Sequence, residues 1–284
     1  MTTQQSSQLQ TDSTEHNFVG TDWLDAHFIS MQPEYEEMLR WVGIQPGWRV
    51  LDAGCGTGGF LPLMTELVGR EGKVSAIDLA PENIVVVEAR QAQSQWPALV
   101  STRVGSMFDM PYEDNSFDAV WSANTTQYFT DEELLKMLKE FRRVVRPGGL
   151  IAIKEYDITS MQFQPTTPML TVHLYESLCR MGKQYHCQLF RTILLPQWLR
   201  KAGLKHIRQK PTLMTRLQPL RAIEKTFVCN FLAFFAHHAK DADLPADERQ
   251  LWEELGDINS PDHIINHPDF QYRGIQTVFV GCAP

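Results

Sequence analysis

The sequence predicts an α/β fold in which a parallel sheet carries helices on both faces. Between residues 48 and 157, short apolar stretches alternate with amphipathic stretches of helical period. The apolar stretch at residues 49–53 runs directly into a glycine-rich turn. The chain has 284 residues, of which 43% are hydrophobic and 21% charged. That length is enough for one large domain, or for one domain with a cap.

The segment before the sheet is predicted to be a tail followed by a helical cap. Residues 1–17 are rich in Gln, Ser and Thr, a composition typical of disorder. Residues 18–47 are predicted to form the cap from two short helices. The first spans residues 22–29, and the second begins at Pro33, because proline is accepted at the first helical position, and ends at Gly43.

Residues 48–157 are predicted to form the core of the domain. The predicted strands are residues 49–53, 74–78, 99–104, 117–122 and 150–156, and the predicted helices are residues 59–68, 81–94 and 131–145. The last helix has the clearest pattern, because acidic residues open it (131–133) and arginines close it (142, 143 and 146). Both groups of charges are favourable for the helix dipole.

The pattern changes after residue 157. Residues 158–204 are predicted to be an inserted helical lid that ends in a helix at 196–202. Residues 205–284 supply the last two strands, at 206–213 and 274–282, with a long helix at 220–239 and an acceptor-side insertion between them. Eleven Lys and Arg against two acidic residues lie within residues 171–226.

Charge and cysteine content exclude several classes of protein. The net charge of −8 disfavours a protein that binds nucleic acid through a broad basic face. The first residues lack a charged start followed by an apolar stretch, and the most apolar run (residues 227–236) is too short to span a bilayer. Five cysteines without CxxC or metal-ligand spacing favour a reducing compartment. We therefore expect a cytoplasmic protein without a metal site.

The strongest motif is the run VLDAGCGTGG at residues 50–59. Glycine lets the backbone turn sharply and approach a ligand, and the helix that follows presents free N–H groups. Gly54, Gly56 and Gly59 also satisfy the GxGxxG pattern, and Asp78 lies where a dinucleotide-binding fold has its ribose-binding acid. On this motif alone, an NAD(P)-dependent Rossmann enzyme stays open.

Three further features favour another ligand. Asp52 lies two residues before the first glycine, where a carboxylate can face an ammonium group but adds nothing to a pyrophosphate site. The segment DNSFD at 114–118 leads into the fourth strand, and RPGG at 146–149 forms the turn into the fifth. In this order and spacing, the features resemble the class I S-adenosylmethionine-dependent methyltransferases. The small-molecule branch with the quinone-biosynthesis C-methyltransferases is the most similar, over residues 48–157.

The resemblance implies a doubly wound, Rossmann-like sheet of seven strands, the last of them antiparallel, with the helical cap and lid added to it. It also implies S-adenosyl-L-methionine as the cofactor. Gly54, Gly56 and Gly58 would form the loop under the methionine part of that cofactor. Asp52 would lie near its amino group.

The resemblance assigns further cofactor contacts beyond the glycine loop. Asp78 would accept both ribose hydroxyls, and Leu79 would pack on the adenine. After the third strand the family usually has an acid beside the adenine amine, whereas this chain has Ser106, followed by Met107. Asn124, just past the fourth strand, would line the methyl-transfer site.

The predicted function is methylation of a small, largely apolar metabolite on oxygen or carbon. Transfer from a sulfonium is an in-line displacement, so the protein mainly aligns the acceptor and excludes water. An oxygen acceptor would also need a base or an acidic hydroxyl. Glu155 and Tyr156 at the end of the fifth strand, with His173 in the lid, are the predicted catalytic residues. The sequence leaves oxygen and carbon both open.

Alternatives remain for the partner and for turnover. A methyltransferase-fold module that binds without turnover stays open, as does a homo-oligomer. Residues 124–127 read NTTQ and lack the Pro-Pro-aromatic run of enzymes that methylate nucleic-acid bases, so we expect neither a nucleic-acid nor a membrane partner. An acceptor with an anionic tail would use Arg180, Lys183 and Arg191, although a solvated helix face explains these cations as well.

Overall fold

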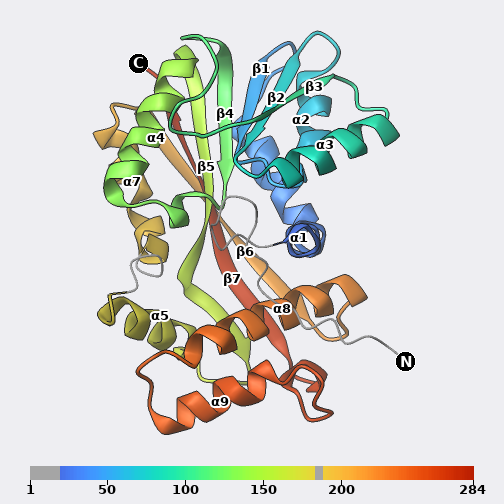
Figure 1. Cartoon of the computed structure of the whole chain (residues 1–284), viewed down its shortest axis with the longest axis vertical. Coiled ribbons are helices and arrows are strands. Elements are labelled where there is room, and N and C mark those ends of the chain that lie inside the picture. Colours follow the sequence, from blue (N-terminus) through green and yellow to red (C-terminus); the bar gives the residue numbers. More distant parts are fainter. Residues whose placement is uncertain (1–19, 183–187) are drawn as a thin grey trace.

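The computed structural model describes residues 20–182 and 188–284, and within them one seven-stranded sheet has the order β3-β2-β1-β4-β5-β7-β6 (Figure 1). The strands are β1 (Arg49–Ala53), β2 (Lys73–Asp78), β3 (Val100–Val104), β4 (Phe117–Ala123), β5 (Val145–Gln164), β6 (Lys205–Leu217) and β7 (Gln271–Cys282). β7 runs antiparallel to β5 and β6, whereas the first five strands pair in parallel. The predicted α/β fold with an antiparallel last strand is confirmed. The predicted tail, residues 1–17, lies outside the described residues.

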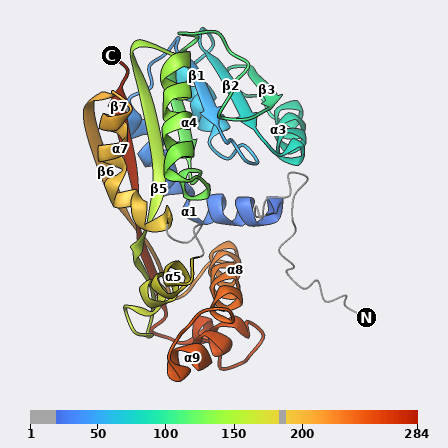
Figure 2. The ribbon, with the colours of Figure 1, turned by 60° about the vertical axis from the view of Figure 1, so that its left-hand side comes forward.

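Helices cover both faces of the sheet (Figure 2), and each face contributes to an apolar core. One core joins the sheet to α1 (Thr21–Val42), α2 (Leu61–Val68) and α3 (Pro81–Gln93). The other core joins the opposite face to α4 (Asp131–Val144) and α7 (Leu195–Lys201). This arrangement follows from strands that are apolar on both sides, because a parallel sheet must bury both of its faces.

The N-terminal cap contains one continuous helix in place of the two predicted. α1 runs through Pro33, so the prediction that this proline begins a second helix is wrong. Buried side chains recur along α1 from Ala26 to Val42, and one unbroken face therefore packs against the rest of the protein. The carbonyl that loses its hydrogen bond to Pro33 belongs to Ile29, which is 45% exposed and lies near solvent.

The strands β5, β6 and β7 extend beyond the other strands and carry a second group of helices (Figures 1 and 2). β5 has 20 residues, far more than the predicted residues 150–156, and pairs with β7 along most of that length. On this extension lie α5 (Leu170–Arg180), α8 (Ala222–Ala239) and α9 (Ala246–Gly256). The short 3-10 segments are η1 (Thr126–Tyr128), η2 (Leu189–Leu194) and η3 (Ile264–Asn266).

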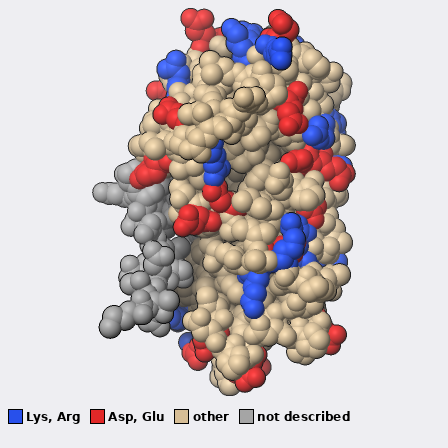
Figure 3. All heavy atoms as spheres, turned by 90° about the vertical axis from the view of Figure 1, so that its right-hand side faces the viewer, with Lys and Arg blue, Asp and Glu red and all other residues tan. Residues whose placement is uncertain are grey.

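Surface and cysteine chemistry add three observations. No helix among residues 20–182 and 188–284 is both long enough and apolar enough to cross a membrane. On the face shown in Figure 3, basic and acidic side chains are interspersed.

The described cysteines are of two kinds. Cys55, Cys229 and Cys282 are free, but Cys179 is disulfide-bonded. The cysteine pattern therefore gives no argument for a reducing compartment.

Candidate functional site

The glycine loop, residues 54–59, leaves β1 at the carboxyl edge of the sheet. Gly54 N donates to Ile77 O (2.8 Å), which ties the loop to the end of β2. Gly54, Gly56 and Gly58 have φ values of 73°, 53° and 80°, in the left-handed region. A Cβ at Gly54 would also lie 2.7 Å from Cγ2 of Thr125. The turn therefore needs glycine for both conformation and space.

Asp52 lies just before this loop, and its environment fits a cationic ligand group. The residue is 1% exposed, and its Oδ2 atom has no hydrogen-bond partner among the described residues. Burial, followed by the charge of Asp78, raises the pKa of the Asp52 carboxyl to about 8. A buried carboxyl without a partner is stabilised by an ammonium group, such as the one on the methionine part of S-adenosylmethionine. The residues present therefore fit that cofactor.

Asp78 joins the end of β2 to the glycine loop. Its Oδ2 accepts a hydrogen bond from Gly56 N (2.8 Å), and its Oδ1 accepts from Ala80 N and Asn83 Nδ2 (both 3.0 Å). The carboxylate is thereby held at the carboxyl edge of the sheet, where ligands of open α/β sheets bind. Leu79 follows it and is 39% exposed. The contacts of Asp78 with a ribose and of Leu79 with an adenine remain predictions.

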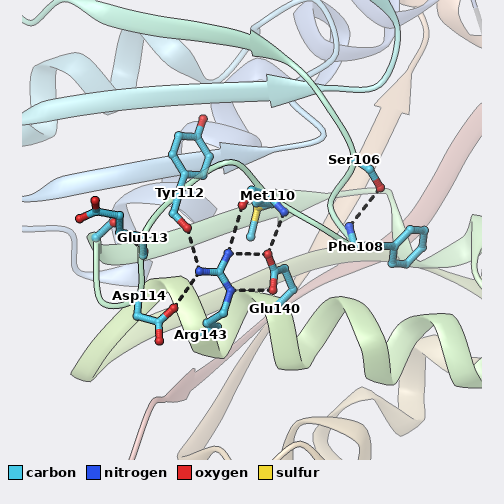
Figure 4. Close-up of polar contacts among 9 residues, drawn as sticks. Ser106, Phe108, Met110, Tyr112, Glu113, Asp114, Glu140 and Arg143 are labelled. Carbon is cyan, nitrogen blue, oxygen red and sulfur yellow. Dashed lines mark hydrogen bonds and ion pairs between the residues drawn. The ribbon is translucent and has the colours of Figure 1, made fainter.

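The loop after β3 is fixed from the neighbouring helix by one arginine (Figure 4). Arg143 of α4 donates to the carbonyl oxygens of Tyr112 (2.7 Å) and Met110 (3.1 Å) and to Oδ1 of Asp114 (2.9 Å). It also pairs with Glu140, whose Oε1 accepts from Met110 N (2.8 Å). We call Arg143 and Glu140 the loop clamp. Sequence reasoning assigned Arg143 only to the helix dipole and missed this role.

The clamp holds the segment that contains Ser106 and Met107. The Ser106 hydroxyl accepts from Phe108 N (3.1 Å), so it stabilises the turn itself (Figure 4). Met107 reaches the glycine loop, since its Cε lies 3.3 Å from the position of a Cβ on Gly54. The Ser122 hydroxyl lies 3.9 Å from the Met107 sulfur. Met107 therefore borders the loop, and the adenine contacts of both residues remain predictions.

Asn124 follows β4 and contacts a buried lysine that the sequence did not single out. Its φ is 58°, and its Oδ1 accepts from Lys154 Nζ (2.9 Å). Lys154 is fully buried, with Nζ 4.0 Å from the ring centroid of Tyr35 and 5.1 Å from that of Tyr156. Burial lowers the pKa of the Lys154 ammonium well below its usual value, whereas the charge of Glu155 acts in the opposite direction.

A second group of buried polar side chains adjoins this lysine. His27 Nε2 is hydrogen-bonded to the hydroxyl of Tyr35 (2.5 Å) and to that of Tyr156. Gln276 of β7 donates to the Tyr35 hydroxyl (2.8 Å). Burial lowers the pKa of His27, and the charge of Lys154 lowers it further, so His27 is neutral near pH 7. We call His27, Tyr35, Lys154 and Tyr156 the buried polar cluster.

The three predicted catalytic residues do not converge. Side chains alternate between the two faces of a strand, so the neighbours Glu155 and Tyr156 point to opposite sides of β5. Glu155 Oε1 accepts from Thr126 N (2.7 Å), whereas Tyr156 belongs to the core on the α1 side. His173 lies on α5, and its Nδ1 is 2.6 Å from Oε1 of Glu248 on α9. The structure brings only Tyr156 into the buried polar cluster.

Helix α1 covers the glycine loop and lies between it and α8 (Figure 2). Asp25 accepts from the Thr57 hydroxyl (2.7 Å) and pairs with Arg90 of α3, which also donates to Thr57 O (2.7 Å). Leu24 Cδ1 lies 3.4 Å from the position of a Cβ on Gly56. The cap is thus attached directly to the loop that would hold the cofactor.

The predicted cations for an anionic tail are not arranged around this site. Arg191 is 6% exposed, pairs with Asp131 (2.7 Å) and donates to two carbonyl oxygens of the turn around η1 (2.6 and 2.7 Å). Its hydrogen bonds hold that turn, so it does not offer a cation to a ligand in this structure. Arg180 is exposed and pairs with an acidic residue of its own helix. Lys183 lies outside the described residues.

Comparison with known proteins decides between the two interpretations of the glycine motif. Residues 50–149 match the family model described as a methyltransferase domain. Residues 50–149 form a class I, S-adenosylmethionine-dependent methyltransferase domain. This confirms the predicted resemblance and favours S-adenosylmethionine over a nicotinamide cofactor.

Curated relatives of the methyltransferase domain cover part of the chain. It is 31% identical over 137 residues to a 2-phytyl-1,4-naphtoquinone methyltransferase of Trichormus variabilis, with 48% of this chain and 57% of the relative covered. It is 33% identical over 134 residues to a demethylmenaquinone methyltransferase of Staphylococcus aureus, with 47% and 51% covered. The chain thus spans about half the length of these relatives.

Solved structures share the fold over most of the chain. A putative methyltransferase from Bacillus halodurans has a TM-score of 0.58 at 14% identity, covering 89% of this chain and 99% of that one. A phosphoethanolamine N-methyltransferase of Haemonchus contortus, in complex with S-adenosyl-L-methionine, has a TM-score of 0.56 at 17% identity, covering 94% and 58%. The architecture of the methyltransferase domain therefore extends through the later strands.

Proposed function

We propose that the chain is an S-adenosylmethionine-dependent methyltransferase that methylates oxygen or carbon of a small, largely apolar metabolite. The observation that carries the proposal is the buried Asp52 carboxyl, directly before the glycine loop of a methyltransferase domain, whose Oδ2 has no hydrogen-bond partner among the described residues. A module that had lost its ligand would not need to keep an unpaired carboxyl there, because replacing it with an apolar side chain would be stabilising.

On the cofactor side, the proposed contacts come from the glycine loop and from side chains at the strand ends. The glycine loop would hold the methionine part, Asp52 its ammonium group and Asp78 the ribose, with Leu79 and Met107 beside the adenine. When bound, the cofactor supplies a methyl group already activated on a sulfonium. The protein then has to hold the acceptor in line and exclude water. Helix α1 excludes water by covering the loop.

On the acceptor side, aromatic rings surround the buried polar cluster. Trp23 of α1 stacks on Phe231 of α8 with ring centroids 5.3 Å apart, and Phe234 lies 5.8 Å from Trp23. Such walls suit an apolar ring compound, and the curated relatives are named for methylating naphthoquinone and menaquinone precursors. Tyr156 lies in this cluster and is the predicted catalytic residue that the proposal retains. Glu155 and His173 stay predictions from the sequence.

Access requires α1 to move, because its side chains separate the glycine loop from α8. The proposal therefore includes exchange of cofactor and acceptor through displacement of α1. An anionic tail on the acceptor forms no part of it, because Arg191 is engaged within the protein. A cytoplasmic location remains the expectation from the sequence.

A thermal-shift screen of the purified chain against S-adenosylmethionine, NAD and NADP tests the cofactor. We expect stabilisation by S-adenosylmethionine alone, since a ligand that binds only the folded state raises Tm. Incubation with a pool of hydroquinones and phenols, followed by mass spectrometry of S-adenosylhomocysteine and methylated products, tests turnover. Binding without product from any acceptor favours the non-catalytic module, and stabilisation by a nicotinamide cofactor alone rejects the proposal.

A further inference from the structure

The turn that follows β4, residues 124–129, packs against the glycine loop through Thr125. Cγ2 of Thr125 lies 2.7 Å from the position of a Cβ on Gly54, so its methyl group fills the space beside that glycine. The Thr125 hydroxyl is hydrogen-bonded to the Ser122 hydroxyl (2.8 Å), which donates to Ala53 O (2.7 Å) at the end of β1. The position of Thr125 therefore limits where the glycine loop can lie.

Two buried charged side chains hold the residue that follows Thr125. Glu155 of β5 is 1% exposed, and its Oε1 accepts from Thr126 N (2.7 Å). Arg191 of η2 is also buried, and its Nη2 donates to the carbonyl oxygens of Thr126 (2.6 Å) and Phe129 (2.7 Å). The turn is thus fixed through the N–H of Thr126 on one side and through its carbonyl on the other.

The guanidinium of Arg191 suits this task because its donors form a rigid, planar fork. While Nη2 binds the two carbonyl oxygens, Nη1 pairs with Asp131 (2.7 Å) in the first turn of α4. An arginine that served only a surface ion pair would keep its guanidinium in water, where such pairs contribute little. Here the guanidinium is buried against main-chain oxygens, which indicates that holding the turn is its main contribution.

Both of these side chains lie outside the segment that matches the methyltransferase domain. The turn at residues 124–129 belongs to that segment, which covers residues 50–149. Glu155 follows the segment in β5, and Arg191 lies in the insertion between β5 and β6. The insertion therefore supports a part of the domain that adjoins the glycine loop.

We propose that Arg191 is a positioning residue for the cofactor, because it holds the turn after β4 where Thr125 supports the glycine loop. The consequence for cofactor affinity rests on the proposed methyltransferase function. Gly54, Gly56 and Gly58 have few conformational restrictions of their own. Without the support of Thr125, the loop adopts other conformations, and a ligand must then pay for ordering it.

Hydrogen exchange in the ligand-free full chain tests this support without the cofactor. The amides of Gly54 and Gly47 each donate to a carbonyl oxygen at 2.8 Å. Arg191→Met should make exchange at Gly54 about tenfold faster and leave exchange at Gly47 unchanged, because only the glycine loop loses its support. Arg200→Met, on an exposed arginine of α7, should change neither amide. Mass spectrometry of short peptides that contain each glycine measures the rates.

A double-mutant cycle on S-adenosylhomocysteine affinity tests the path through Thr125. Thr125→Ser removes the methyl group beside Gly54 and keeps the hydroxyl that bonds to Ser122. Calorimetry should show each single variant, Arg191→Met and Thr125→Ser, binding about threefold to tenfold more weakly than the wild type. The double variant should bind at most about twofold more weakly than the weaker single variant, since both changes remove the same support.

Failure of this inference is distinguishable from failure of the proposed function. Absence of S-adenosylhomocysteine binding by the wild type contradicts the proposed function and leaves the exchange test in force. Equal exchange at Gly54 in the wild type and Arg191→Met overturns the inference, as do losses of affinity that multiply in the double variant. If Arg191→Met does not fold, Thr125→Ser alone decides, because unchanged exchange at Gly54 in that variant also overturns the inference.

Discussion

The proposed cofactor side and the proposed acceptor side of this site are built in different ways. The cofactor side consists of main-chain atoms of the glycine loop and two carboxylates at strand ends, all within residues 52–78. The acceptor side consists of buried side chains that α1, β5 and β7 bring together from distant parts of the chain. Thus the first is defined by local backbone geometry, and the second depends on where α1 packs.

The largest expected effect is on the backbone of the cofactor side. Gly54→Ala should abolish S-adenosylhomocysteine binding, because the added Cβ would lie 2.7 Å from Thr125 Cγ2 and displace the loop. Gly47→Ala is the matched control, since Gly47 also has a positive φ (81°) but no atom near its Cβ position. Both should lose about 1–2 kcal/mol of stability from backbone strain. Equal S-adenosylhomocysteine affinity in the two variants, measured by calorimetry, contradicts this account of the loop.

Asp52→Asn should weaken binding of the cofactor but make the ligand-free protein more stable at pH 8. The pKa of Asp52 is raised to about 8 in the folded protein, so folding favours its neutral form and stability falls as pH rises from about 4 to 8. Asparagine cannot ionise, and the Tm of the ligand-free variant should exceed that of the wild type at pH 8. At pH 4 the two should agree. Differential scanning calorimetry at both pH values checks this. A lower Tm for the variant at pH 8 would contradict the claim that burial raises the pKa of Asp52.

The loop clamp should have an intermediate effect, because it acts on the cofactor through a segment that it holds. Arg143→Gln removes the contacts to Met110, Tyr112 and Asp114, and S-adenosylhomocysteine affinity should fall about threefold to tenfold. Arg142→Gln, one residue earlier on α4, is the control and should leave the affinity unchanged. An equal loss in both variants would indicate a general effect on the helix.

The smallest effect is expected where α1 is attached to the glycine loop. Asp25→Asn weakens the partly exposed pair with Arg90, and such pairs contribute at most about 1 kcal/mol. The release of S-adenosylhomocysteine should therefore become faster, by about fivefold at most. Stopped-flow measurement of dissociation checks this. A slower release would show that α1 opens by a route that does not separate Asp25 from the loop.

The difference between the two sides also explains what the sequence could predict. The glycine run, Asp52 and Asp78 lie in contiguous segments whose residue types follow from strand–turn–helix geometry, so they could be located by spacing. The helix that became α4 was predicted because acidic residues open it and arginines close it, and the structure adds a capping box formed by Thr130 and Glu133. Pro33 was misleading, because a favourable packing face along α1 outweighed one lost hydrogen bond.

On the acceptor side only Tyr156 was predicted, because no spacing motif marks the other residues. Lys154 directly follows the apolar residues 150–153 of β5 and is itself buried, and a buried lysine must have a partner. His27 is one of nine histidines in the sequence, and only the packing of α1 against β5 distinguishes it from His173. The length of β5, which reaches Gln164, depends on its pairing with β7 and not on its own residues.

Calorimetric titration with S-adenosylhomocysteine between pH 6 and pH 9 tests the central claim, that the buried Asp52 carboxyl beside the glycine loop is the ammonium site of a methyltransferase. Binding requires the ionised carboxyl, so wild-type affinity should rise with pH, by up to about tenfold per unit, and level off above the pKa of about 8. Asp52→Asn should bind at least about tenfold more weakly, with affinity that does not rise in this way. Wild-type affinity that is flat with pH and equal to that of Asp52→Asn would contradict the account.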